Sequence, residues 1–277
     1  MVIIILLRES SYKETLFSVL EQLNHEQMTG RTPDMRLKTR KRLKIFSFSI
    51  IGIIVVILGG FYIYTLDYYR ADDQAQEVMA GTETEKNRVQ KLDNMWVFYP
   101  DEEKDSDTGL IFYPGGKVEA TAYSPLLAQL SQSGITCVLI KMPFNLAVFD
   151  IHAADRVFKQ LPSIQKWYIG GHSLGGAMAS SYANSNSDKI EGLILLGAYP
   201  VGQSNVPVLA LYGSEDKVLN RSKLDATDNK REITGGNHAY FGNYGEQKGD
   251  GTATITREQQ QRETVEEVAA YILDEAE

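Results

Sequence analysis

The sequence predicts an α/β protein, with a mostly parallel sheet flanked by helices, behind a single N-terminal transmembrane helix. Residues 45–66 form a long apolar run without a charge. Beyond residue 93, short apolar runs alternate with segments of helical periodicity, which is typical of a parallel sheet covered on both faces. We therefore divide the chain into a basic leader (1–44), a transmembrane anchor (45–66), a polar stalk (67–93) and a folded domain (94–277).

The composition excludes several classes of protein. The 277 residues are 43% apolar and 23% charged, which excludes disordered and collagen-like chains. Cys137 is the one cysteine, so no disulfide can form within the chain. Residues 1–44 hold nine Lys and Arg against five Asp and Glu, whereas residues 45–277 hold 19 against 31. Such an acidic body repels phosphate backbones, so we expect no nucleic-acid partner.

The run Ile45–Leu66 has the length of a membrane span. Its 22 residues make a helix of about 33 Å, and the hydrocarbon layer is about 30 Å thick. Six Lys and Arg residues lie in 36–44, directly before the run, whereas three Asp residues and one Arg, Arg70, follow it in 67–73. The positive-inside rule therefore predicts a single-pass plasma-membrane protein with a cytoplasmic N-terminus and an extracytoplasmic body. A cleavable signal peptide is the alternative, but its apolar region is normally about 7 to 15 residues long.

The leader contains a possible short helix of its own. Ser11 and Glu14 have the spacing of a capping box at a helix start. Met35, which directly precedes the basic cluster, would also be a natural first residue. We interpret residues 1–34 either as a small cytoplasmic helix or as a product of start-codon choice. Residues 67–93 are polar and poor in large apolar side chains, as expected of a stalk.

Seven apolar runs of the body are candidate strands, and helical patterns lie between them. The runs are Met95–Tyr99, Leu110–Tyr113, Ile135–Lys141, Trp167–Gly170, Gly192–Leu196, Val206–Tyr212 and Arg231–Thr234. Apolar residues recur at helical spacing in 123–130, in 154–161 and in the last segment, 265–272. The last of these is preceded by Thr256 and Gln259, which have the spacing of a capping pair.

The turn after the fourth predicted strand has the pattern G-x-S-x-G. It reads Gly-Gly-His-Ser-Leu-Gly-Gly over residues 170–176 and runs into a helix-compatible segment. A sharp strand-to-helix turn exposes a serine hydroxyl in a strained conformation, and glycines two residues to either side remove side chains that would collide. Ser173 is therefore the candidate nucleophile.

A serine hydroxyl needs a base, and the chain has four histidines to supply one. His25 lies on the other side of the predicted membrane. His172 is adjacent to the nucleophile, where we expect its side chain to point elsewhere, and His152 precedes the turn at the start of a helix. His238 remains, in the loop after the last predicted strand. In sites whose serine lies on a strand–turn–helix motif, the histidine follows the serine along the chain, as His238 does here.

The acid and the oxyanion donors follow the ends of other strands. Asp216 is our choice for the acid that orients His238, with Glu215 as the alternative, because both follow the strand that ends near Tyr212. The turn Pro114–Lys117 follows another strand, and we expect an oxyanion hole formed by the N–H of Gly116 or Lys117 together with that of Leu174.

These motifs resemble the α/β-hydrolase superfamily, in that family's order, over residues 94–277. The elbow GGHSLGG, the strand end GSEDKV, the loop GGNHAYFG and the turn YPGGK carry the resemblance. The compact architecture is similar to the dienelactone-hydrolase-like branch. True dienelactone hydrolases have a Cys nucleophile where this chain has Ser173, so the resemblance does not extend to their substrate. Many members also have His-Gly where this chain has Pro114-Gly115-Gly116.

We therefore expect a membrane-anchored serine hydrolase that cleaves an ester, thioester or related acyl bond through an acyl-enzyme. Its substrate would be a small-molecule or lipid-like acyl compound, its other partner the bilayer around residues 45–66, and no metal or cofactor is expected. Two alternatives keep the same fold. One is a catalytically inactive envelope binding or scaffold domain, since fold alone does not specify activity. The other is an acyltransferase that uses the same three residues.

Overall fold

The computed structural model describes residue 18 and residues 33–80, 89–101 and 107–274. The chain forms two compact units, Met1–Leu66 and Asp67–Glu277.

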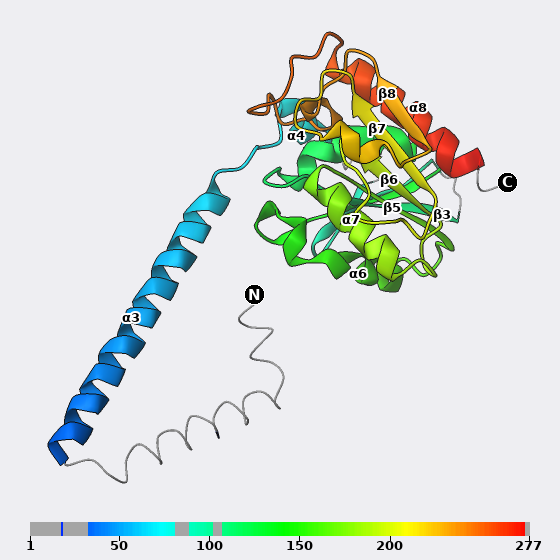
Figure 1. Ribbon diagram of the computed structural model, residues 1–277. Helices are drawn as coiled ribbons and strands as arrows, with labels where there is room; N and C mark the ends of the chain where they lie inside the picture. The colour runs from blue at the N-terminus through cyan, green and yellow to red at the C-terminus, as the bar shows by residue number, and fades with distance from the viewer. Residues whose placement is uncertain (1–17, 19–32, 81–88, 102–106, 275–277) are drawn as a thin grey trace. The chain divides into compact units, whose positions relative to one another are not determined.

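In the part of the first unit that the structure describes, residues 33–66 form the long helix α3 (Pro33–Leu66). Its segment Arg40–Leu66 is long and apolar enough to cross a membrane. The most apolar 18 residues of this segment have a mean hydropathy of 2.4, and none of them is buried. The prediction of one N-terminal apolar helix is confirmed, and this helix extends back into the basic part of the leader (Figure 1). The predicted capping box at Ser11 and Glu14 lies outside the described residues.

The second unit is built on one sheet of eight strands within the described residues, in the order β1-β2-β4-β3-β5-β6-β7-β8. The strands are β1 (Val89–Leu92), β2 (Met95–Phe98), β3 (Thr108–Tyr113), β4 (Thr136–Ile140), β5 (Lys166–His172), β6 (Gly192–Leu196), β7 (Val208–Gly213) and β8 (Lys230–Ile233). The β1–β2 and β2–β4 pairs are antiparallel and the other five are parallel. The mostly parallel sheet is therefore confirmed, with every predicted strand present; β1 is an addition.

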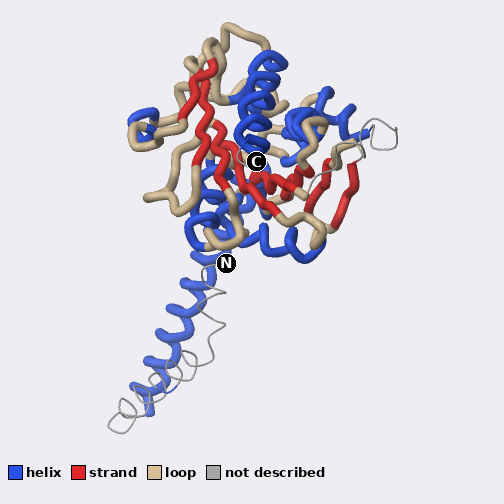
Figure 2. The backbone as a smooth tube through the Cα atoms, turned by 90° about the vertical axis from the view of Figure 1, so that its right-hand side faces the viewer, coloured by secondary structure: helices blue, strands red, loops and turns tan. Residues whose placement is uncertain are grey.

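Helices cover both faces of this sheet (Figure 2). The longer ones are α4 (Asp73–Ala80), α5 (Ser124–Ser131), α6 (Ala154–Gln160), α7 (Leu174–Ser185) and α8 (Arg257–Asp274). The short 3-10 helices are Ala120–Tyr123, Pro143–Asn145, Ala147–Phe149, Ile151–Ala153, Arg221–Leu224 and Ala239–Phe241. Along β4, Cys137 and Leu139 pack in the apolar cluster with α4, α5 and α8, whereas Val138 and Ile140 pack in the cluster with α6 and α7. A strand that is buried on both faces has no polar face, which is why β4 appears in the sequence as a continuous apolar run.

The prediction that residues 67–93 form a polar stalk is wrong for the described parts of this segment. The second unit begins at Asp67, and α4 and β1 both belong to it. Ala71 and Ala75 are buried against the core, and β1 pairs with β2. Larger apolar residues of the segment, Tyr69, Val78, Met79 and Val89, pack against the same cluster of the domain core.

Candidate active site

Ser173 occupies a sharp turn between the end of β5 and the start of α7. Its backbone has φ 51° and ψ −121°, a conformation that is strained for a residue with a side chain, and its N–H donates to the carbonyl of Leu196 (3.0 Å). A Cβ on Gly171 would lie 2.6 Å from the carbonyl oxygen of Tyr113, and one on Gly175 would overlap that same oxygen. The two glycines thus allow the turn to pack against the end of β3, as their spacing predicts.

His238 and Asp216 form a buried pair. The imidazole Nδ1 lies 2.8 Å from Asp216 Oδ2, and the two side chains are 1% and 0% exposed. The other carboxylate oxygen, Oδ1, accepts the N–H groups of Val218 (2.9 Å) and Leu219 (2.8 Å). Both oxygens of the carboxylate are therefore engaged, which holds it in one orientation behind the imidazole.

Of the two acids considered for this position, Asp216 is the one that contacts the histidine. The Glu215 carboxylate instead accepts a hydrogen bond from Ser214 Oγ (3.0 Å). The histidine loop is fixed from the other side, because Gln260 of α8 bonds both the N–H (2.9 Å) and the carbonyl (2.8 Å) of Asn237.

Ser173 and His238 lie at the same edge of the sheet, above the end of β6. The Ser173 N–H bonds Leu196, and the next residue, Gly197, lies under the imidazole: a Cβ there would be 2.8 Å from His238 Nδ1. In the described part of the chain, His238 Nε2 is buried without a hydrogen-bond partner, and no hydrogen bond joins it to Ser173 Oγ. Such bonds are often long in structures without substrate and tighten when substrate binds.

The turn after β3 has one N–H left for an oxyanion. Gly115 N–H donates to Tyr123 Oη (3.1 Å), and Lys117 N–H donates to the Asn145 carbonyl (2.8 Å). Within the described residues, the N–H groups of Gly116 and Leu174 donate to no backbone carbonyl. Gly116 packs directly on Leu174, since a Cβ on it would lie 2.8 Å from Leu174 Cδ2. Of the expected donors, the Lys117 N–H is already engaged by the Asn145 carbonyl, which leaves Gly116 and Leu174 as the candidates.

His172 belongs to the site, contrary to the expectation that its side chain points elsewhere. Its ring is buried 4.4 Å from that of His238, centroid to centroid, and its Nδ1 lies 2.8 Å from Tyr123 Oη. Burial, and to a lesser extent the charge of His238, hold the pKa of His172 well below its usual range. Burial also raises the pKa of Tyr123, so its hydroxyl stays protonated; it accepts the Gly115 N–H and is hydrogen-bonded to His172 Nδ1. In the sequence, the one indication that His172 could belong to the site is that it directly precedes Ser173.

The other polar candidates lie outside this arrangement. The His152 side chain is 70% exposed and faces Asp155 (3.9 Å), and His25 lies outside the described residues. Cys137 is buried in β4, and burial raises its thiol pKa, as expected for a residue of the core. Among the described residues, no group of three or more His, Cys, Asp and Glu side chains is arranged to hold a metal ion.

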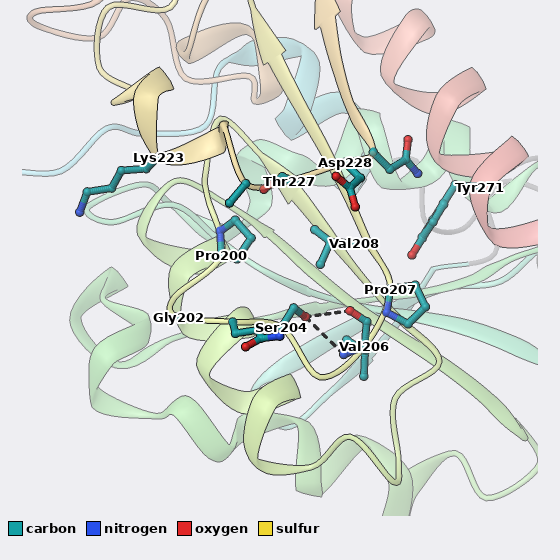
Figure 3. A pocket seen from close by; sticks show the side chains of 13 residues that line it. Pro200, Gly202, Ser204, Val206, Pro207, Val208, Lys223, Thr227, Asp228 and Tyr271 are labelled. Carbon is teal, nitrogen blue, oxygen red and sulfur yellow. Dashed lines mark hydrogen bonds between the residues drawn. The ribbon is translucent and has the colours of Figure 1, made fainter.

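A cleft of about 820 Å³ lies elsewhere on this unit (Figure 3). It is lined by the loop 200–208, by residues 223–229 and by Tyr271, and none of Ser173, Asp216 and His238 is among its lining residues. Val208 begins β7 and Asn229 precedes β8, so the cleft reaches the amino ends of these strands. The serine and histidine are at the carboxyl ends, where parallel sheets place their sites.

Comparison with known proteins agrees with this architecture. The Est1E structure from Butyrivibrio proteoclasticus is similar with a TM-score of 0.50 and 14% identity, covering 69% of this chain and 98% of that one. A monoacylglycerol lipase from Paleococcus ferrophilus has a TM-score of 0.49 and 14% identity, covering 65% and 99%. At such identities the likeness concerns the fold alone. No curated protein matches the sequence significantly. Residues 109–262 match the model of the alpha/beta hydrolase family. Since the match covers more than half of the sequence, this chain belongs to the alpha/beta hydrolase family.

Proposed function

We propose that this protein is a membrane-anchored serine hydrolase that cleaves an ester, thioester or related acyl bond outside the cytoplasm. The observation that carries the proposal is the buried His238–Asp216 pair. Among the described residues, His238 Nε2 has no hydrogen-bond partner, and His238 lies at the sheet edge that also holds Ser173. A base held in one tautomer beside a serine on a strained turn is the arrangement that activates a hydroxyl for acyl transfer.

The chemistry proceeds in two balanced steps. Ser173 Oγ attacks the substrate carbonyl carbon as its proton moves to His238 Nε2, and the carbonyl π electrons move onto oxygen. The N–H groups of Gly116 and Leu174 stabilise that oxyanion. When it collapses, the alcohol or thiol leaves with the proton from His238, and the acyl group stays on Ser173. Water then repeats the sequence and releases the acid, while Asp216 stabilises the imidazolium in both steps.

The side of the membrane is inferred from the charges that flank α3. Lys and Arg residues dominate the segment before the apolar run, so the positive-inside rule places Asp67–Glu277 outside. Protease treatment of intact cells tests this orientation. We expect the part of the chain after Leu66 to be degraded while the leader is spared, and protection of the whole chain would reverse the orientation.

The hydrolase proposal is tested by labelling the full-length protein in detergent with a fluorophosphonate. We expect one adduct, on Ser173, and none in Ser173→Ala. Ser181→Ala is the matched control, because that hydroxyl lies two turns further along α7 and bonds the Ala177 carbonyl (3.0 Å). Turnover of 4-nitrophenyl acetate that is lost in Ser173→Ala separates an enzyme from an inactive scaffold. Folded protein that is neither labelled nor active contradicts the proposal.

A further inference from the structure

The segment Asp67–Ala80, which we call the strap, joins α3 to the active site. Tyr69 N–H donates to the Lys117 carbonyl (2.8 Å), and Glu119 N–H donates to the Tyr69 carbonyl (2.9 Å). These two bonds form a parallel bridge between Tyr69 and Val118. Asp67 also forms an ion pair with Lys117 (3.1 Å). The first residues after the apolar helix are therefore bound to the turn that carries the proposed oxyanion donor.

The strap also contacts the loop that carries His238. Asp72 N–H donates to the Asn243 carbonyl (2.9 Å), and the ring of Tyr69 lies 5.5 Å from that of Tyr244. Arg257 at the start of α8 bonds the Asp72 carboxylate (2.9 Å). The strap is thus attached to both sides of the site, the oxyanion turn and the histidine loop.

The length of chain between α3 and the strap limits how far this face can lie from a membrane. α3 ends at Leu66, and Tyr69 is already paired with Lys117. Three residues of fully extended chain span at most about 11 Å. The polar layer on each side of the hydrocarbon is about 5 to 8 Å thick. If α3 spans the bilayer, the oxyanion turn lies at or just beyond the headgroups, whatever the orientation of the domain.

An apolar loop lies next to the same turn. Lys117 N–H bonds the carbonyl of Asn145, and the neighbouring side chains of Phe144 and Val148 are 50% and 47% exposed. Phe144 (φ 56°) and Asn145 (φ 54°) both have left-handed backbone conformations, which a bulky side chain such as Phe rarely adopts. Four large apolar side chains are exposed in the described part of the second unit, and two of them are on this loop. Apolar groups held outward at the rim of a site gain stability when they enter lipid.

We propose that this site acts on the acyl bond of a lipid resident in the bilayer that α3 crosses, with the loop 142–149 inserted among its headgroups. This inference rests on the proposed function and narrows its substrate class. The short connection keeps the site near the lipid surface. Because the strap is bonded to the oxyanion turn and to the loop that carries His238, both of these substrate-facing segments stay close to the membrane.

The test uses the full-length protein in vesicles of phosphatidylcholine and phosphatidylglycerol with two esters. One is 4-methylumbelliferyl oleate, dissolved in the bilayer, and the other is 4-nitrophenyl acetate, dissolved in water. Five EAAAK repeats are inserted between Leu66 and Asp67, which adds a semi-rigid helix of about 37 Å. We expect the oleate ester to be hydrolysed at least about tenfold more slowly and the acetate ester within about twofold of wild type. An oleate rate that the spacer does not change overturns the inference, and so does an equal loss on both esters.

A matched pair of substitutions tests the loop itself. Val148→Ser should lower the rate on the bilayer ester several-fold and leave the acetate rate unchanged. Val201→Ser is the control, because that valine is also exposed (42%), and its N–H is held by Ser180 of α7 (2.9 Å), away from the strap. Equal behaviour of the two variants on both esters contradicts a role for the loop at the membrane. Wild-type protein that hydrolyses neither ester and is not labelled at Ser173 refutes the hydrolase proposal as well, whereas loss of the distance dependence alone refutes only this inference.

Discussion

The ring of His172 lies between Tyr123 and His238, 4.4 Å from the second and hydrogen-bonded through Nδ1 to the hydroxyl of the first. Because Tyr123 also accepts the N–H of Gly115, one chain of contacts links the oxyanion turn to the proposed base. Protonation of His172 would place a positive charge on a buried ring in contact with the proposed base.

The lowered pKa of His172 predicts a loss of stability in acid. The ring stays neutral in the folded protein, whereas in the unfolded chain it takes up a proton below about pH 6.5. The unfolded state then binds more protons, so the free energy of unfolding falls as pH falls from 6.5 toward the folded pKa. The slope is up to about 1.4 kcal/mol per pH unit for this one group. Melting temperatures of full-length protein in detergent between pH 5 and 7.5 measure it.

His172→Gln should remove this part of the pH dependence. The same substitution at His152, whose side chain is 70% exposed, should leave the wild-type dependence in place. If the His172 variant retains the full acid sensitivity of the wild type, another group is responsible for it.

Tyr123→Phe should impair both stability and catalysis. It leaves the Gly115 N–H and His172 Nδ1 buried without their partner, and each unsatisfied group costs about 1–3 kcal/mol. The freed turn carries Gly116, so we expect kcat on 4-nitrophenyl acetate to fall about tenfold or more, with a smaller change in KM.

Tyr113→Phe is the control for that substitution. The Tyr113 hydroxyl is also buried between two partners, since it donates to the Ile151 carbonyl (2.8 Å) and accepts the Ala154 N–H (2.9 Å). We expect comparable destabilisation but little loss of kcat in the folded fraction. Equal kcat values for the two variants would show that Tyr123 is structural only.

Asp216→Asn should lower kcat by about 10⁴-fold, the size of effect known for the acid of a serine–histidine–acid site. An amide can donate a hydrogen bond to Nδ1 and so favours the wrong imidazole tautomer. Glu215→Gln should stay within about twofold of wild type, because its carboxylate bonds Ser214 and not the histidine. Rates with 4-nitrophenyl acetate measure both, and a large loss in the glutamine variant would move the role to Glu215.

Much of this fold is readable from the sequence because local patterns determine it. Strands β4 and β6 are largely apolar since both of their faces are buried, and the start of α8 is set by neighbouring side chains. Gln259 accepts the Thr256 N–H (2.8 Å) and Thr256 accepts that of Gln259 (3.2 Å), as their spacing predicts. The glycines around Ser173 are equally local, because their absent side chains are what allow the turn.

The parts that the sequence did not predict depend on contacts between distant segments. β1 is a four-residue edge strand with two exposed polar positions, so its pairing with β2 leaves little pattern. The strap is attached through backbone hydrogen bonds, through ion pairs with Lys117 and Arg257, and through a short row of apolar residues of which only the alanines are fully buried. The position of His172 depends on Tyr123, which is 49 residues away and on another element. Tertiary proximity of this kind has no signature in a single sequence.

Gly197→Ala tests how closely the imidazole position is set. Gly197 has φ +54°, and an added Cβ would lie 2.8 Å from His238 Nδ1 and 3.3 Å from Asp216 Oδ2. The methyl group must displace the imidazole or the end of β6. We expect kcat to fall about 10²-fold or more, since small displacements of positioned groups have effects of that size.

The backbone cost of this change can be separated from its effect on the site. Gly202 also has a left-handed backbone (φ +73°), and a Cβ there would meet nothing within 4 Å. An alanine in that conformation costs about 1–2 kcal/mol at either position, so both variants should melt at lower temperature than wild type. Only Gly197→Ala should also lose turnover of 4-nitrophenyl acetate in the folded fraction. Equal activity of the two variants would mean that the His238–Asp216 pair tolerates displacement. The close approach of Gly197 to the imidazole would then not affect catalysis.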